Sequence, residues 1–360
     1  MKGVILVGGE GMRMRPLTYH TPKPLLPIAN VAFVERQIKW LSSHGINEII
    51  LSLGYLPDTF EEYFHTNPIE NVHIEYAIED NPLGTAGAIK YAIKDVDDDF
   101  VVCNGDVLTD LDITELMTMH RQRNSQATIA LTYVEDPSAF GVVPTDENNK
   151  VIAFVEKPPL ETAPSHWINA GIYILSPRFL DLIPENVQVS IERETFPTLL
   201  ENGSMYALES QAYWLDIGTP TQYLRAHSDY LDSINKYEEQ DSLIEVAPGL
   251  FSDGEVKIGR DVIIKSRSLV GAGTVIGDNC VLEATSMGRR CILGDDVKLS
   301  NSVLHAGVNI EQGCYVDSSI IGEATTIGAN SDLSQHCLVK AHENVESNSR
   351  LKAERVGMIV

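Results

Sequence analysis

The strongest constraint on the fold of this chain is a period of six residues in its last third. From residue 256 onward, aliphatic residues recur at this spacing, and a glycine follows many of them. The positions in phase are Ile258, Ile264, Val270, Ile276, Leu282, Leu293, Leu299, Ile310, Val316, Ile321, Ile327, Leu333 and Val339. This pattern is typical of a hexapeptide-repeat parallel β-helix, in which three hexads form one triangular coil around stacked anchors. Slips in the period near residues 288, 305 and 322 predict loops or adjusted turns.

The first 230 residues alternate strand and helix patterns instead. Apolar runs predict strands at residues 4–7, 49–53, 72–78, 100–103 and 128–134. Periodic apolar positions predict a helix capped by Asn30 and ended by Gly45, and a capping box at Asp58 predicts a short helix. Two further helices are predicted at residues 85–94 and 113–123. Strands that alternate with helices predict an α/β fold with a doubly wound, mainly parallel, Rossmann-like sheet.

The change of pattern divides the chain into four parts. A helix with Thr219 as its cap and Pro220 in its first turn ends the α/β part, and the acidic run 238–241 follows it. We therefore predict a catalytic domain at 1–230, a linker at 231–250, a β-helix domain at 251–345 and a tail at 346–360.

Composition excludes several classes of partner. The net charge of −24 argues against nonspecific binding to nucleic acid or to anionic membranes. No apolar run approaches the ~18 residues of a membrane span, and the first residues lead into a strand rather than a secretion signal. The five cysteines include no Cys-x-x-Cys pair, which indicates reduced thiols. We therefore expect a cytoplasmic protein without nucleic-acid or membrane partners.

A glycine-rich turn follows the first predicted strand. Gly8, Gly9 and Gly11 would expose backbone N–H groups that can cradle a phosphate. The segment ends neither like the ATPase loop nor like the dinucleotide fingerprint, because Met14 stands where the latter has its third glycine. Arg13, Arg15 and Lys23 add a local cluster of positive charge to an acidic chain. Such a loop suits a triphosphate.

The order of the motifs identifies a family. The glycine segment continues as Arg13-Met14-Arg15-Pro16-Leu17-Thr18 and ends in Pro22-Lys23-Pro24. Further matches are Pro82–Gly87, Asn104–Val107, Phe140–Val143, Phe154–Pro158, Asn169–Tyr173 and Trp214–Gly218. The chain resembles the sugar-nucleotide pyrophosphorylases, over residues 1–230 by these motifs and over nearly all of its length with the repeats. The resemblance is strongest to members that join GTP and mannose 1-phosphate, and it implies a left-handed β-helix.

The resemblance implies a nucleoside triphosphate and a sugar 1-phosphate as substrates, with Mg²⁺ as cofactor. Asp106 and Asp216 match the pair that holds the metal, and Mg²⁺ favours one or two carboxylates plus phosphate oxygens. Arg13 and Lys23 would stabilise the leaving pyrophosphate. Arg15 either joins them or pairs structurally with a carboxylate. Together with Lys157, the two aspartates, Arg13 and Lys23 form the predicted catalytic set.

The same matching assigns the two ligand subsites. Lys157 would bind the sugar phosphate, while Gly141, Glu156 and Asn169 match sugar contacts. The nucleotide site would comprise Gly8, Gly9, Gly11, Arg13, Lys23, Glu79, Gly84 and Thr85. A carboxylate at Glu79 suits the N1–H and N2–H₂ donors of guanine, and an exposed strand-end acid is the alternative. Met12 departs from the family, where a small hydroxyl residue is usual.

Three alternatives stay open from the sequence. The first is a thymidylyl- or uridylyltransferase that acts on glucose 1-phosphate. The second is a bifunctional uridylyltransferase and acetyltransferase, because hexapeptide β-helices also occur in acyltransferases; we interpret His305 and His336 as structural instead. The third is a regulatory homologue without activity, against which the intact catalytic set argues. We predict that the β-helix mediates a homo-oligomer.

Overall fold

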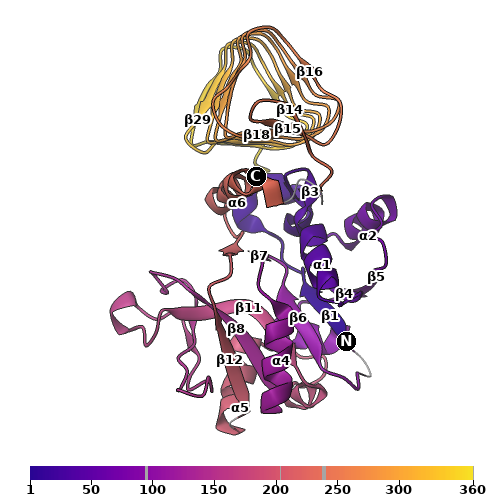
Figure 1. The fold of residues 1–360 in the computed structure, drawn as a ribbon, viewed down its shortest axis with the longest axis vertical. Helices are drawn as coiled ribbons and strands as arrows, with labels where there is room; N and C mark the ends of the chain where they lie inside the picture. Colours follow the sequence, from indigo (N-terminus) through magenta and orange to yellow (C-terminus); the bar gives the residue numbers. More distant parts are fainter. Residues whose placement is uncertain (94–95, 203, 237–240, 360) are drawn as a thin grey trace. The chain divides into compact units, whose positions relative to one another are not determined.

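The computed structural model describes residues 1–93, 96–202, 204–236 and 241–359. The chain groups into two compact units. Figure 1 shows the ribbon coloured along the sequence. Unit 1 contains Met1–Gly9 and Val34–Asp216, and unit 2 contains Glu10–Phe33 and Ile217–Val360. The glycine signature is therefore divided between the units. Of the predicted acidic linker, residues 238–240 lie outside the described ranges, and the predicted domain boundaries stay a prediction.

Unit 1 is built on a nine-stranded sheet with the order β10-β9-β11-β6-β1-β4-β5, extended by β8 and β12. The strands are β1 Lys2–Leu6, β4 Glu48–Leu53, β5 His73–Ile78, β6 Phe100–Asn104, β8 Ala127–Tyr133, β9 Gly141–Val142, β10 Val155–Glu156, β11 Trp167–Leu175 and β12 Met205–Ser210. The β5-β4-β1-β6 part is parallel, and β11 joins β6 antiparallel. The carboxyl ends of β1 and β6 thus lie at the same edge of the sheet, as the Rossmann-like prediction requires.

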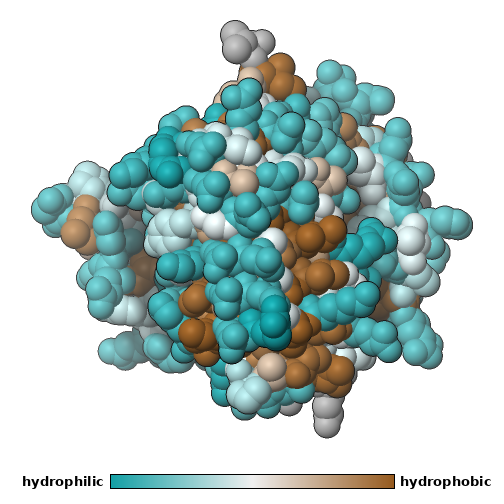
Figure 2. Space-filling model, turned by 90° about the horizontal axis from the view of Figure 1, so that it is seen from above, coloured by the Kyte–Doolittle hydropathy of each residue, from teal (hydrophilic) through white to brown (hydrophobic). Residues whose placement is uncertain are grey.

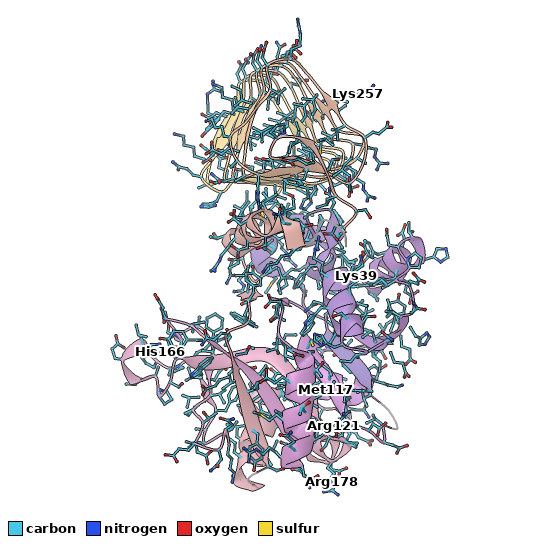
Figure 3. All side chains as sticks on the ribbon, viewed as in Figure 1. Lys39, Met117, Arg121, His166, Arg178 and Lys257 are labelled. Atoms are coloured by element: carbon cyan, nitrogen blue, oxygen red, sulfur yellow. The ribbon has the colours of Figure 1, made fainter. Side chains whose placement is uncertain are left out.

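The helices of unit 1 largely follow the predicted pattern. They are α1 Phe33–Ser43, α2 Pro57–Thr66, α3 Gly84–Ala92, α4 Ile113–Arg123 and α5 Phe196–Asn202, with short helical turns at Leu160–Thr162, Pro177–Leu182 and Ile191–Thr195. Met117 and Arg121, one turn apart, mark one side of α4 in Figure 3. The predicted capping box at Asp58 is wrong. Leu56 is the N-cap of α2 and Pro57 opens the helix, because the fixed φ of proline already suits this position.

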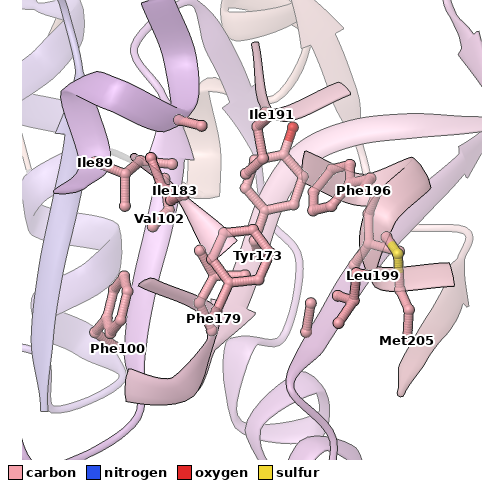
Figure 4. Close-up of a cluster of buried hydrophobic side chains, with 14 of the residues drawn as sticks. Ile89, Phe100, Val102, Tyr173, Phe179, Ile183, Ile191, Phe196, Leu199 and Met205 are labelled. Carbon is pink, nitrogen blue, oxygen red and sulfur yellow. The ribbon is translucent and has the colours of Figure 1, made fainter. Parts of the chain in front are cut away.

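An aromatic cluster forms part of the core of unit 1 (Figure 4). The ring of Tyr173 lies 5.3 Å from that of Phe196, which lies 6.0 Å from the ring of Phe179. All three side chains are fully buried. Since Tyr173 belongs to β11, this cluster supports the strand that carries Asn169.

Unit 2 contains a parallel β-helix of three sheets. The eight-stranded sheet comprises β14 Ile244–Ala247, β15 Leu250–Ser252, β18 Ser268–Val270, β21 Ser286–Met287, β24 Val303–Leu304, β27 Ile320–Ile321, β30 Leu338–Val339 and β33 Arg355–Val356. The second sheet comprises β16 Lys257–Ile258, β19 Val275–Ile276, β22 Ile292–Leu293, β25 Asn309–Ile310, β28 Thr326–Ile327 and β31 Asn344–Val345. The third comprises β17 Ile263–Ile264, β20 Val281–Glu283, β23 Lys298–Ser300, β26 Tyr315–Asp317, β29 Asp332–Ser334 and β32 Arg350–Lys352. Most of the predicted anchors are buried and stack from coil to coil.

The slips in the period are turn adjustments between coils. Some coils are 18 residues long, as in the pair Arg260 and Asp278, whereas others are 17 long, as in the pair Ser300 and Asp317. The shorter coils turn one corner through a residue in the left-handed region, such as Asn301 (φ 45°) and Ser318 (φ 48°). Left-handed residues also stand at corners of full hexads, such as Asp261 (φ 56°) and Asn330 (φ 56°), and the anchors stay in register in both kinds of coil.

Unit 2 also contains the segment 10–33 and a helix. The segment forms the hairpin of β2 Pro27–Ile28 and β3 Val31–Ala32, with short turns at Met12–Met14, Leu17–Tyr19 and Lys23–Leu25. The helix α6 spans Pro220–Asp232, is capped by Thr219 as predicted, and is followed by a turn at Ile234–Lys236. None of the helices in the described ranges is long and apolar enough to cross a membrane.

Candidate active site

A cavity of about 190 Å³ opens in unit 1 where several strands end. It is lined by residues from β6, β9, β10 and β11 and from a separate two-stranded ladder of β7 Val107–Thr109 and β13 Trp214–Asp216. The predicted site residues that it brings together are Asp106, Gly141, Glu156, Lys157, Asn169 and Asp216. The residues predicted for metal and sugar phosphate, dispersed over 110 positions of sequence, thus share one cavity.

Strand pairing brings the two aspartates together. In the antiparallel ladder of β7 and β13, Asp216 lies opposite Val107, the residue that follows Asp106. The turn before Asp106 is pressed against the end of β1, because the backbone N–H of Gly105 donates to the carbonyl of Leu6 at 2.9 Å. A Cβ at this glycine would lie 2.4 Å from Val7 Cγ1. Only glycine allows this close approach, which positions Asp106 at the sheet edge.

Gln37 in α1 holds the same turn, a role that no sequence motif indicated. Its Nε2 donates to the carbonyls of Asn104 and Val107, both at 2.9 Å, so the amide spans the backbone on either side of Asp106. The side chain is only 3% exposed. The sequence did offer one indication of this role. Gln37 lies beside the apolar positions Val34 and Ile38 of the helix, and a buried amide needs hydrogen-bond partners.

The oxygen donors at this edge suit a hard divalent cation. Besides the carboxylates of Asp106 and Asp216, the cavity contains Asn104, whose Oδ1 is buried and accepts no hydrogen bond from any described residue. No group of three or more His, Cys, Asp or Glu side chains that could hold a metal occurs within the described ranges. A site with so few protein ligands fits Mg²⁺, which completes its shell with phosphate oxygens and water.

Lys157 directly follows β10, beside a carboxylate. Its Nζ lies 3.5 Å from Glu156 Oε1, and the lysine side chain is 58% exposed. Its backbone is left-handed (φ 50°), and its N–H donates to the carbonyl of Phe140 at 2.9 Å. A lysine in this region is uncommon, and such conformations concentrate at functional sites. Gly141 lies opposite Glu156, and a Cβ there would lie 2.6 Å from the ring of Phe154.

Asn169 organises a bulge in β11. Its Nδ2 donates to the hydroxyl of Tyr173 and its Oδ1 accepts from the N–H of Gly171, both at 2.8 Å. Burial, with a smaller effect from Glu192, raises the pKa of Tyr173 far above its ordinary value, so this hydroxyl stays protonated. The Asn169 amide keeps one hydrogen and one lone pair for the cavity.

The lining of the cavity also includes Glu192, Phe140 and Trp214, to which the sequence assigned no role. Glu192 Oε2 accepts from Thr85 Oγ1 at 3.0 Å and from Ser190 Oγ at 2.9 Å. Trp214 donates from Nε1 to the carbonyl of Ala170, and its ring meets that of Phe140 edge to face at 5.6 Å. Trp214 and Phe140 stand inside the recognised motifs, whereas no motif indicated Glu192.

The predicted base-binding residues form a neighbouring group around the start of α3. Glu79 accepts from Ser52 Oγ at 3.1 Å and from the N–H of Leu83 at 2.9 Å, so its carboxylate fastens the turn that precedes the helix. Gly84 (φ 69°) approaches the carbonyl of Val189 so closely that a Cβ would lie 2.6 Å from it. Thr85 connects this group with the cavity through Glu192. The reading of guanine by Glu79 stays a prediction.

The glycine signature is split between the units. Gly8 in unit 1 packs against Gly54. A Cβ added to Gly54 would lie 3.2 Å from the carbonyl oxygen of Gly8. In unit 2, Gly11 is left-handed (φ 62°), and its carbonyl accepts from Thr18 Oγ1 at 2.9 Å.

The three cations of the signature in unit 2, Arg13, Arg15 and Lys23, differ in their surroundings. Arg15 pairs with Glu10 at 2.8 Å, as the structural alternative for this arginine expects, and its role toward the nucleotide stays a prediction. Arg13 is exposed, as is the unusual Met12. Lys23 opens a short helical turn and is half-buried.

Comparisons with known proteins match the first and the last part of the chain separately. A family described as nucleotidyl transferase matches residues 2–233, and the left-handed β-helix (LbH) domain of EIF2B subunit epsilon matches residues 248–351. The mannose-1-phosphate guanylyltransferase of Mycobacterium tuberculosis is 37% identical over 302 residues, 81% of this chain and 82% of that protein. Mannose-1-phosphate guanylyltransferase 1 of Arabidopsis thaliana is 35% identical over 316 residues, 86% of this chain and 82% of that protein.

A solved structure shows the same fold for the first part of the chain. HddC from Yersinia pseudotuberculosis, complexed with GMP-PN, superposes with a TM-score of 0.55 at 31% identity, over 64% of this chain and 99% of that chain. The chain belongs to the nucleotidyl transferase family. It is a nucleotidyltransferase whose Rossmann-like sheet precedes a left-handed β-helix, and both predictions of fold are thereby confirmed.

Proposed function

We propose that this enzyme transfers GMP from GTP to mannose 1-phosphate and releases GDP-mannose and pyrophosphate. A phosphate oxygen of the sugar 1-phosphate would attack the α-phosphorus, and the bond from that phosphorus to the bridging oxygen of the β-phosphate would break. The names of the relatives support both substrates, and the GMP-PN complex of HddC supports the guanine. The observation that carries the proposal is the ladder of β7 and β13, which joins Asp106 and Asp216 in a cavity with Lys157.

The residues of the cavity divide the work of binding and orientation. Lys157 would hold the phosphate of the sugar as a point charge, and Glu156 would accept hydrogen bonds from sugar hydroxyls. Asn169 has a free amide hydrogen and a lone pair for the sugar, and Gly141 leaves room for it. Asp106 and Asp216, with the Asn104 amide oxygen, would hold Mg²⁺. When bound, this ion neutralises charge on the phosphate oxygens.

The nucleotide would be bound by the remaining predicted residues. The glycines of the signature would offer backbone N–H groups to the triphosphate, and Arg13 and Lys23 would stabilise the pyrophosphate as it leaves. Gly84 and Thr85 would lie near the base, with Glu79 either reading it or supporting the turn that does.

We further propose that unit 2 mediates a homo-oligomer without acetyl transfer. Exposed apolar side chains recur on the second and third sheets of the β-helix, at Ile263, Val275, Ile292 and Tyr315. Figure 2 shows apolar side chains gathered among polar ones on the surface seen in that view. His305 is buried beside the Tyr223 hydroxyl, and burial lowers its pKa to about 4, which is unsuited to a general base.

The five cysteines support a reducing, cytoplasmic location, since each is buried and unpaired.

A matrix of substrates tests the proposed reaction. Pyrophosphate release is measured with GTP, ATP, UTP and dTTP, each against mannose, glucose and N-acetylglucosamine 1-phosphate, with Mg²⁺ present and after chelation. We expect the highest kcat/KM for GTP with mannose 1-phosphate, and none after chelation. Preference for dTTP or UTP would refute the guanylyl assignment, and consumption of acetyl-CoA would revive the bifunctional alternative.

A further inference from the structure

The last strand of the β-helix contacts the backbone of the glycine signature within unit 2. We propose that Arg355 in β33 is a positioning residue for the loop 11–15. Through this arginine the β-helix would hold the segment that carries Arg13, in addition to any role in assembly. The proposal rests on the proposed function only in assigning this loop to the nucleotide phosphates.

The guanidinium of Arg355 spans two carbonyl groups of the loop. Its Nη2 donates to the Arg13 carbonyl at 3.0 Å, and its Nη1 donates to the Arg15 carbonyl at 2.5 Å. The planar fork of an arginine presents two parallel N–H donors, so a single side chain can fix two acceptors at a set separation. A lysine has no such fork and reaches one of them at a time.

These two carbonyls are among those of the loop that accept no local hydrogen bond from the described residues. The turn Met12–Met14 is closed by the N–H of Met14 on the Gly11 carbonyl and by the N–H of Arg15 on the Met12 carbonyl. Neither the Arg13 nor the Arg15 carbonyl accepts a backbone hydrogen bond from the described residues. A three-residue turn is weak by itself, since its hydrogen-bond geometry is poor. Arg355 therefore supplies the missing restraint.

A second contact joins the same two segments. The hydroxyl of Tyr19 accepts from the N–H of Ile359 at 3.2 Å, and the ring of Tyr19 lies 5.3 Å from the guanidinium carbon of Arg15. Residues 355–359 thus contact this part of the chain at two places, the carbonyls of the loop and Tyr19, which lies four residues after the loop. Both contacts involve β33 and the residues after it rather than an earlier coil.

Arg350 provides a matched control. It is also an exposed arginine at the start of a β-helix strand, β32, and it also donates to two carbonyls, those of Asn330 and Ser349. Its acceptors belong to the β-helix, however, and not to the loop. Replacing Arg350 should therefore reproduce any general effect of losing an arginine from the last coils, without releasing the loop.

Hydrogen exchange of the full-length protein without substrates tests the positioning role directly. In Arg355→Ala, the amides of Met14 and Arg15 should exchange at least about threefold faster, because opening of the turn costs less free energy. Arg350→Ala should leave their exchange unchanged. This measurement does not depend on which nucleotide the enzyme uses, so it can succeed even where the guanylyl assignment fails. Unchanged exchange in Arg355→Ala would overturn the proposal.

Kinetics separate a positioning role from a purely structural one. We expect the KM for the nucleotide to rise roughly three- to tenfold in Arg355→Ala, with less than a twofold change in the KM for the sugar phosphate. Arg355→Lys should recover part of the loss. Equal changes in both KM values, or the same changes in Arg350→Ala, would reject the role. If Arg355→Ala does not fold, Arg355→Lys and Arg355→Gln are compared by the same exchange measurement.

Discussion

The cavity of unit 1 and the β-helix of unit 2 are specified in different ways. In the β-helix, each anchor packs on the equivalent anchor of the next coil, 17 or 18 residues away, so one pattern repeats the same contact. In the cavity, Asp106 and Asp216 meet through a single ladder between distant strands. The stacking contact between anchors is therefore present many times in the β-helix, whereas the ladder that places the two aspartates is present once. We therefore expect substitutions in the β-helix core to lower stability and substitutions in the cavity to lower turnover.

The largest effect is expected at Asp106. Replacing it by asparagine removes a charge from the predicted metal site while keeping its shape, and should lower kcat at least roughly 100-fold with an unchanged melting temperature. Asp146→Asn is the control, because the Asp146 carboxylate accepts hydrogen bonds from N–H groups of its own turn and an asparagine side chain can do the same. Near-normal turnover of a folded Asp106→Asn enzyme would exclude this residue from the metal site.

A substitution in the β-helix core should show the opposite pattern. Leu299 is 1% exposed and stacks between Leu282 and Val316. Leu299→Ala should cost about 2–5 kcal/mol in the free energy of unfolding, because it leaves a cavity between coils. The kcat of the folded protein should stay within about twofold. Lys298→Ala, the outward-facing neighbour, is the control in denaturant unfolding. A large loss of kcat without a loss of stability would contradict the contrast between the regions.

Lys157 tests the division between the two substrates. Lys157→Ala should lose a charge-assisted contact of roughly 1.5–3 kcal/mol, which corresponds to about a 10- to 150-fold lower kcat/KM for the sugar phosphate. The KM for GTP should change little. Lys257→Ala, an exposed lysine of β16 (Figure 3), should have no effect on either. A rise confined to the KM for GTP would mean that the two phosphate subsites are interchanged.

The smallest effect is expected at Glu79, where two roles compete. Glu79→Gln replaces one acceptor oxygen with a donor, so either the contact with Leu83 or a contact with guanine weakens by about 1 kcal/mol. If Glu79 reads the base, the ratio of kcat/KM for GTP to that for dTTP should fall about fivefold. If it only supports the turn, both values should fall together. Ser52→Ala removes a hydrogen-bond donor to Glu79 and leaves the charge of Glu79 unchanged. Its effect on kcat/KM therefore measures how much of the Glu79→Gln effect comes from loosening the turn.

Local patterns predicted the elements well and their attachments less well. The helix at 113–123 has the predicted bounds, because Asp112 caps it within four residues of sequence. The capping box at Asp58 failed, since Pro57 offered a better start for the same helix. Glu192 and Gln37 carried no motif, because their roles come from partners such as Thr85 and the carbonyl of Asn104, which are distant along the chain.

The sequence by itself determined the period of the β-helix, the alternation of the α/β part and the order of the family motifs. These features depend on neighbours along the chain, and their physical basis is the regular burial of apolar side chains. The tertiary structure decided which carboxylates share a cavity, that Glu79 fastens a turn, and that Arg355 holds the carbonyls of the signature loop. A polar side chain is satisfied by whichever partner folding brings within about 3 Å, and no local pattern encodes that partner.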